Sequence, residues 1–177
     1  MIPTHNDMRI LFEGKPEEYI DLYREELDEF LKPDEEDELR EFEDFSDVES
    51  LDAEELFEIL FTIPMTTDDD YCEVVNILAD EYLPYDIDAD YENKKLVVYI
   101  DEDKYVIDSQ DGYSILRKFD EIIKPEFEIR VMKLSLDEDN VHSLVILKSD
   151  DWKDLEIKYA DKVAAYFETI DKTDFKR

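Results

Sequence analysis

The chain has 177 residues, of which 53 are Asp or Glu and only 20 are Lys or Arg, so its formal net charge is −33. Hydrophobic residues make up 43% of the sequence and aromatic residues 12%, and this supply of core-forming side chains excludes an intrinsically disordered acidic chain. The excess of carboxylates also argues against direct binding to nucleic acid or to an anionic membrane, because both surfaces repel negative charge.

Helical patterns fill the first half of the chain. Pro16 is suited to the first turn of a helix, and Pro33 ends it. Between them the apolar residues recur on one face: Tyr19, Ile20, Tyr23, Leu27, Phe30 and Leu31. We expect His5 to lie in a mobile terminus. After Pro33 the acidic stretch predicts at most a marginal helix, because like charges three and four residues apart oppose helix formation.

Two further helices are predicted before residue 85. Asp52 and Glu55 have the spacing of a capping box, and the apolar face that follows runs to Pro64. Thr67 is then expected to cap the next helix, with three aspartates favourably placed against its N-terminal dipole. Pro84 ends that helix. Its apolar face consists of Tyr71, Val74, Val75, Leu78 and Tyr82.

The second half predicts β-hairpins alternating with helices. Residues 96–100 and 104–107 form one expected hairpin, and 127–131 with 141–147 form another. Helical spacing over residues 115–123 separates them. Ser149 is expected to cap a final helix, whose shared face consists of Trp152, Leu155, Tyr159, Val163, Tyr166 and Phe167.

These elements predict an α+β fold. N-terminal helices precede a ββαββα pattern, which a four-stranded antiparallel sheet covered by helices satisfies. The length suits a single domain over residues 1–177, with an acidic helical half at 1–84 and a β-hairpin/helix half at 85–177.

A cytoplasmic location is expected from three further features. The start of the chain has no basic segment followed by an apolar one, so no signal peptide is apparent. No apolar run approaches the roughly 20 residues of a membrane-spanning helix. Cys72 is the only cysteine, so no intrachain disulfide can form, and we expect it to be buried on a helix.

A calcium loop is weakly indicated by the spacing of Asp86, Asp88 and Asp90. A genuine EF-hand loop has Gly at its sixth position and a bidentate Glu at its twelfth. Tyr91 and Val97 occupy those positions here. The sequence therefore predicts no specific metal site.

Catalytic patterns are equally weak. Asp86, Glu92 and Lys94 have the residue types of a metal-dependent nuclease, but an acidic enzyme would repel its polyanionic substrate. His5 and His142 have no partner in a recognisable motif, and we expect His142 to be a structural histidine of the sheet. No catalytic residue, cofactor or metal ligand is predicted.

The charge is distributed unevenly along the chain. Residues 1–60 contain 23 acids and five bases, residues 61–120 contain 16 and five, and residues 121–177 contain 14 and ten. Such asymmetry indicates a charged interaction surface, although an acidic run is often only a solvated face. Two segments that combine acids with nearby aromatic residues form the expected site for a basic protein partner. They consist of Asp34, Glu35, Glu36, Asp37, Glu38, Glu41, Glu43, Asp44, Asp47 and Glu49, and of Tyr85, Asp86, Asp88, Asp90, Tyr91 and Glu92.

In size, acidity and α+β pattern, the chain resembles the acidic immunity proteins that bacteria make against toxins. The resemblance is at the level of this class and covers the whole chain without a family motif. It implies a protein that inhibits a basic toxin, whose cationic site accepts carboxylates in place of phosphates. Two alternatives stay open: a nucleic-acid mimic from a phage or mobile element, and an enzyme or regulator whose acidity is incidental. Gene neighbourhood would distinguish the three.

Overall fold

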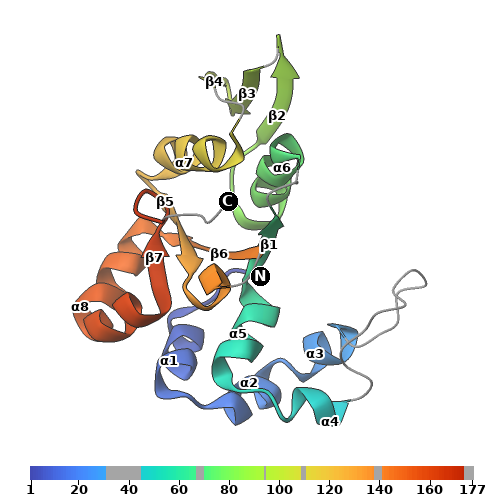
Figure 1. Cartoon of the computed structure of the whole chain (residues 1–177), viewed down its shortest axis with the longest axis vertical. Coiled ribbons are helices and arrows are strands. Elements are labelled where there is room, and N and C mark those ends of the chain that lie inside the picture. Colours follow the sequence, from blue (N-terminus) through green and yellow to red (C-terminus); the bar gives the residue numbers. More distant parts are fainter. Residues whose placement is uncertain (31–44, 67–69, 94, 109–110, 138–140, 174–177) are drawn as a thin grey trace. The chain divides into compact units, whose positions relative to one another are not determined.

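The structure is a computed structural model that describes residues 1–30, 45–66, 70–93, 95–108, 111–137 and 141–173 (Figure 1). It divides into two compact units. One spans Pro3–Thr62, and the other joins Met1–Ile2 to Ile63–Arg177. We call them the helical unit and the sheet unit and describe each by itself. The organisation as one domain stays a prediction.

The helical unit begins with a helix that the sequence analysis missed. Thr4 and Asp7 form a capping box, in which the Asp7 carboxylate accepts from the Thr4 amide at 2.7 Å, and Gly14 ends the helix with φ 65°. The expected mobile terminus around His5 is therefore wrong. The described helices of this unit are α1 (His5–Glu13), α2 (Pro16–Leu22), α3 (Arg24–Phe30), α4 (Phe45–Val48) and α5 (Ala53–Phe61).

The helix expected from Pro16 to Pro33 is broken at Tyr23. Tyr23 leaves helical geometry at φ −120° and ψ 29°, and its hydroxyl donates to the Asp7 carboxylate at 2.8 Å. Tyr23 lies between α2 and α3 and this bond ties it to α1, so one apolar stripe becomes two short helices. The capping box at the start of α5 is confirmed, because Asp52 accepts from the Glu55 amide at 3.0 Å and Glu55 accepts from the Asp52 amide at 2.8 Å.

The sheet unit contains both described sheets, and the α+β class is confirmed. The strands are β1 (Ile63–Thr66), β2 (Ile87–Glu92), β3 (Lys95–Ile100), β4 (Asp103–Ile107), β5 (Phe127–Met132), β6 (Val141–Lys148) and β7 (Phe167–Thr169). The helices are α6 (Tyr71–Tyr82), α7 (Gly112–Ile123), the 3₁₀-helix η1 (Leu134–Asp137) and α8 (Ser149–Tyr166).

The expected four-stranded antiparallel sheet is present, but two of its strands are ones the sequence did not reveal. Its order is β1-β6-β5-β7, whereas β2-β3-β4 form a separate antiparallel sheet. Pro64 had marked the end of a helix, yet it lies in β1, at the sheet edge where proline is tolerated. β7 has only three residues, too few to show a period. The two predicted hairpins therefore belong to different sheets.

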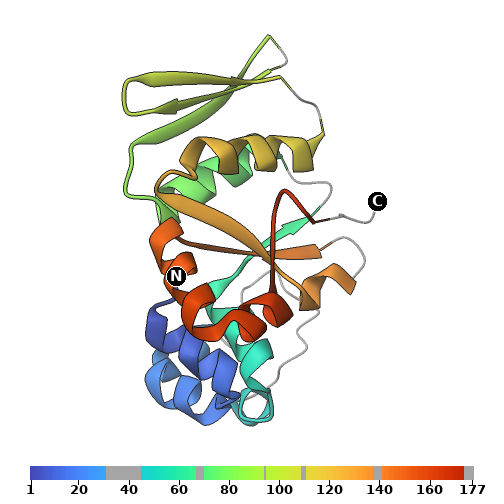
Figure 2. The ribbon, with the colours of Figure 1, turned by 90° about the vertical axis from the view of Figure 1, so that its left-hand side faces the viewer.

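Helices cover both faces of the four-stranded sheet. α6 and α7 lie between the two sheets, and a shared core joins their apolar residues to one face of β5 and β6 (Figure 2). α8 packs on the other face, where Trp152 and Leu155 are buried. Burial on both sides explains why six consecutive residues of β6 are buried instead of every second one.

Two predicted helix caps differ in the structure. Asp70 caps α6 by accepting from the Cys72 amide at 3.0 Å, and Thr67 lies outside the described residues. Ser149 lies within α8, and its hydroxyl donates to the Lys124 carbonyl at 2.7 Å. That tertiary bond replaces the expected cap. α8 is kinked at Tyr159, and Phe167 has already left the helix for β7.

Candidate binding surface

The expected partner-binding residues fall into three groups. The acidic run Asp34, Glu35, Glu36, Asp37, Glu38, Glu41, Glu43 and Asp44 lies outside the described residues. Asp47 and Glu49 belong to the helical unit, where Glu49 is exposed. The group from Tyr85 to Glu92 lies in the sheet unit and contributes β2. Only this last group forms a described surface of several residues.

β2 separates its acidic residues from its apolar ones by strand alternation. Ile87 and Ala89 are buried against the core, whereas Asp88 and Asp90 are exposed on the opposite face of the sheet. In the antiparallel register, Asp88 pairs with Tyr99 of β3 and Asp90 pairs with Val97. We call this opposite face of β2-β3-β4 the outer face. Within the described part of the chain, no ion pair engages Asp88 or Asp90. Their charges are therefore available to a partner.

The strand geometry does not favour a calcium loop at Asp86, Asp88 and Asp90. Asp88 and Asp90 are alternate residues of β2, and Asp86 directly precedes the strand. Alternate residues of an extended strand are separated by roughly 7 Å, so Asp88 and Asp90 lie on the same face without converging on one ion. Over the described ranges, no group of three or more His, Cys, Asp or Glu side chains is placed to hold a metal ion. Lys94, the basic member of the nuclease pattern, lies outside the described residues.

Glu92 is already neutralised within the sheet. Its carboxylate accepts from Lys104 Nζ at 2.8 Å and from the Tyr99 hydroxyl at 2.7 Å. Lys104 and Tyr99 hold the pKa of Glu92 below its ordinary value, and Glu92 in turn raises the pKa of Lys104. Lys95 pairs with Asp108 at 2.6 Å. The negative part of the outer face is thus concentrated at Asp88 and Asp90.

The two tyrosines of the expected site have different surroundings. Tyr85 donates to the Glu126 carboxylate, and its ring meets Phe127 edge-on with centroids 5.9 Å apart. Tyr91 is 46% exposed. The pKa of its hydroxyl is raised mainly by partial burial and, to a smaller extent, by the charge of Asp70. Tyr85 therefore borders the core, while Tyr91 remains accessible.

Asn76 is a contributor that the sequence analysis missed. From α6, its side chain accepts from the Ala89 amide at 2.7 Å and donates to the Ala89 carbonyl at 3.0 Å. Cys72 Sγ also donates to that carbonyl at 3.0 Å. Asn76 thus makes the two hydrogen bonds that a neighbouring strand would make with Ala89. Burial and the nearby aspartates raise the pKa of Cys72, which disfavours the nucleophilic thiolate.

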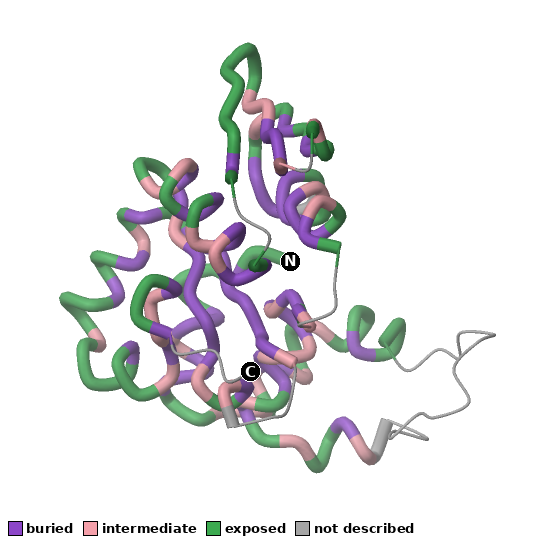
Figure 3. Tube along the Cα trace, turned by 45° about the horizontal axis from the view of Figure 1, so that its top comes forward, coloured by how far each residue is buried: buried purple, intermediate pink, exposed green. Residues whose placement is uncertain are grey.

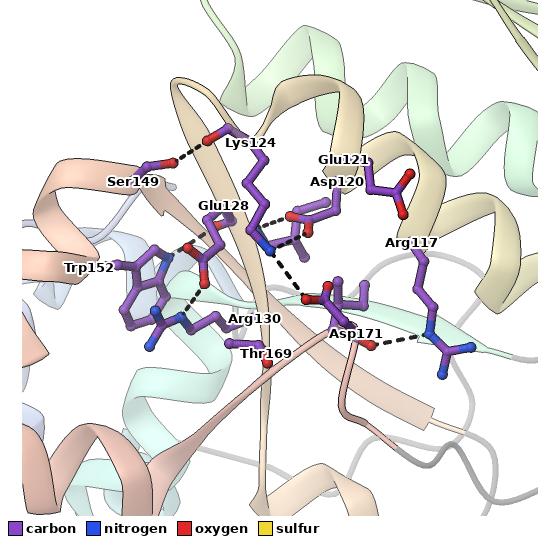
Figure 4. Close-up of polar contacts among 12 residues, drawn as sticks. Arg117, Asp120, Glu121, Lys124, Glu128, Arg130, Ser149, Trp152, Thr169 and Asp171 are labelled. Carbon is purple, nitrogen blue, oxygen red and sulfur yellow. Dashed lines mark hydrogen bonds and ion pairs between the residues drawn. The ribbon is translucent and has the colours of Figure 1, made fainter.

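A polar network surrounds the fully buried Asp120 of α7 (Figure 4). Asp120 accepts from the Ile129 amide at 2.7 Å, and Lys124 Nζ lies 3.5 Å from both Asp120 and Asp171. Burial raises the pKa of Asp120 to about 6. Arg117 donates to the carbonyls of Ile170, at 3.2 Å, and Thr173, at 2.8 Å, and so holds the segment after β7.

The sequence contains a signal for this network at Asp120. Asp120 stands on the apolar stripe of α7, next to Phe119 and three residues before Ile123. A single polar residue on such a stripe indicates a buried hydrogen-bonding role. The network is occupied by internal bonds and has a structural role.

A cavity of about 400 Å³ lies among α8, β5 and β7. Arg130 borders it, but its guanidinium pairs with Glu128 and Glu156, both at 2.8 Å, and lies 4.2 Å from the centre of the Trp152 ring. Lys133 donates to the Ala164 carbonyl at 2.7 Å. Arg130 and Lys133 are therefore engaged within the fold.

The two histidines occupy different environments. His5 is exposed in α1. His142 is buried in β6, as expected for a histidine of the sheet, with its ring centre 5.6 Å from that of Tyr113, and burial lowers its pKa.

Among the helices that the structure describes, none has the length and apolar character needed to cross a bilayer. No protein-family model, curated protein or solved structure matches this chain.

Proposed function

We propose that this chain is a cytoplasmic acidic binding protein that neutralises a basic protein partner, in the manner of an immunity protein that inhibits a bacterial toxin. One observation carries the proposal. If every one of the 20 basic residues paired with a different carboxylate, 33 carboxylates would still have no basic partner. A folded chain with this imbalance repels itself, and a cationic surface relieves the repulsion.

Exposed acids on described elements support the proposal. In α3, Leu27 is buried while Glu25, Glu26 and Asp28 are exposed, so the remaining surface of this helix is largely acidic. In the sheet unit, Asp88 and Asp90 lie on the outer face without an ion pair in the described residues. Carboxylates of this kind can pair with the Lys and Arg side chains of a nucleic-acid-acting toxin.

Electrostatic steering gives the proposed inhibitor its kinetic advantage. Opposite net charges accelerate encounter by about 10- to 1,000-fold at low ionic strength, and added salt screens this acceleration. An immunity protein must capture its toxin before damage occurs, so a fast association rate is more useful to it than a catalytic group.

Co-expression tests the proposal. Each gene neighbouring the one that encodes this chain is induced in bacteria, alone and together with this chain. We expect one neighbouring product to be toxic, to have a basic surface and to lose its toxicity on co-expression through a direct complex. A matched comparison uses the chain with Glu35, Glu36 and Glu38 changed to Lys, which should protect less well. If no neighbouring product is both toxic and bound by the purified chain, the immunity proposal fails.

A further inference from the structure

The two edges of the three-stranded sheet differ in how their main-chain groups are hydrogen-bonded. At the β2 edge, the Asn76 side chain makes both hydrogen bonds with the main chain of Ala89. At the other edge, no described strand pairs with the outer side of β4. Open edges present unpaired amides and carbonyls that can accept a strand from another chain.

The pairing register identifies which main-chain groups face that open edge. Ala89 turns its amide and carbonyl towards Asn76 and away from β3, so Ala89 and Val98 form a non-hydrogen-bonded pair. The bond from the Asp101 amide to the Asp86 carbonyl, at 2.9 Å, agrees with this alternation.

The same alternation continues into β4. Because the main chain of Val98 points away from β2, it bonds to Tyr105, its partner in the next strand. Lys104 and Val106 must then direct their amides and carbonyls outward from the sheet. The open edge therefore offers two adjacent donor–acceptor sets, one at each of these residues.

Side chains along β4 leave this edge accessible. Four of its five residues are exposed, as Figure 3 shows for most of the strand. Val106 is 54% exposed and Tyr105 is 36% exposed. The charge of Lys104, which could have repelled a basic strand, is neutralised by Glu92 at 2.8 Å.

We infer that β4 is a docking edge on which an extended basic segment of the partner adds as a further strand. This inference rests on the proposed function and assigns it a place and a mode of binding. Residues 86–111 contain nine acids and three bases, so the surroundings of the edge complement a Lys- or Arg-rich strand. A second copy of this chain is disfavoured there, because two chains of charge −33 repel each other.

Two fluorescent peptides of equal charge test the inference on the intact chain. One has four Lys-Val repeats and can form a strand, while the other has four Lys-Pro repeats and lacks half of the amides that a ladder requires. We expect the Lys-Val peptide to bind at least about ten-fold more tightly, as measured by anisotropy. Its binding should slow amide hydrogen exchange at Lys104 and Val106.

A pair of substitutions at one residue isolates the main-chain contribution. Val106→Pro removes an outward amide, while Val106→Ala trims the side chain and keeps that amide. The proline variant should lose about ten-fold in affinity for the Lys-Val peptide, and the alanine variant much less. Thermal melting of both variants checks that the sheet persists. The exchange measurement on the unaltered chain tests the inference even if the proline variant unfolds.

The outcomes separate this inference from the proposed function. Equal, salt-sensitive binding of both peptides, without slowed exchange in β4, would overturn strand addition but leave capture of a basic partner standing. Equal affinities of the two Val106 variants would also overturn strand addition. If neither peptide bound at low salt, strand addition and recognition of basic segments would both be contradicted.

Discussion

The first and last parts of the chain use their charged residues in opposite ways. In residues 1–60, five bases accompany 23 acids, and Arg9 and Lys15 share the carboxylates of Glu13 and Glu18 at the surface. In residues 121–177, ten bases accompany 14 acids, and Arg130 is buried between its carboxylate partners. The difference indicates that Glu128 and Glu156 of the last part stabilise a buried cation, whereas the acids of the first part outnumber its bases by 18.

Removing a buried cation should give the largest effect. The Arg130 side chain is 6% exposed, so Arg130→Met would leave the carboxylate of Glu128, itself 13% exposed, without its partner. We expect the free energy of unfolding to fall by about 3 to 5 kcal/mol, measured by urea denaturation. Arg9→Met in the helical unit is the matched control and should lose far less, because its ion pairs are solvated. Equal losses of unfolding free energy in the two variants would show that the ion pairs of the last part stabilise the fold no more than those of the first part.

Asp120 gives the second effect, and its sign depends on pH. Its pKa of about 6 in the folded chain exceeds the ordinary value of 3.8, so between these values the folded state holds a proton that the unfolded state has released. The stability contributed by this group is present below pH 4 and is lost as the pH rises through 6.

Asp120→Asn removes this titration. On acidification from pH 7 to pH 4, the parent chain should gain up to about 3 kcal/mol relative to the variant, measured by denaturation at each pH. Comparing the two chains cancels the acid-induced relief of repulsion that they share. Parallel stability curves would mean that Asp120 is not a proton-binding group in the folded state.

Charge reversal tests the first region directly. Changing Glu35, Glu36 and Glu38 to Lys should slow association with the Lys-Val peptide by about ten-fold at low salt. The matched control changes Asp154, Asp161 and Glu168 to Lys, which alters the net charge equally where acids and bases nearly balance. Stopped-flow fluorescence measures both rates. Similar losses would show that only total charge matters and that the acidic run is a solvated face.

Salt should give the smallest effect. Repulsion among the 53 acids is screened as the Debye length falls to about 8 Å at physiological ionic strength. We therefore expect the melting temperature, measured by calorimetry, to rise by a few degrees between low salt and a few hundred millimolar NaCl. A flat or falling curve would show that internal pairing already compensates the charge.

Local signals in the sequence predicted much of the fold. The capping box at Asp52 and Glu55, the stripe of α7 and the β3-β4 hairpin each depend on residues close together in the chain. The box formed by Thr4 and Asp7 carried the same kind of signal before α1 and was overlooked. β1 and β7 could not be inferred locally, because each becomes a strand by pairing with a distant one.

The candidate surface was only partly predictable for the same reason. Alternation in β2 could have indicated that Asp88 and Asp90 share an exposed face. The pairing of Asn76 with Ala89 could not, because it depends on how α6 packs against a strand edge. The acidic run from Asp34 to Asp44 lies outside the described residues, so its role as an interface stays a prediction.

The separate pairing of the two sheets also sets an order of events during synthesis. Among the described strands, β2, β3 and β4 pair with their neighbours in sequence and with no others, so this meander can form once residue 107 has left the ribosome. β1 pairs with β6, with Ile63 opposite Leu144, and must wait for a segment about 80 residues further on. The meander that bears the β4 edge is therefore expected to assemble while the four-stranded sheet is still incomplete.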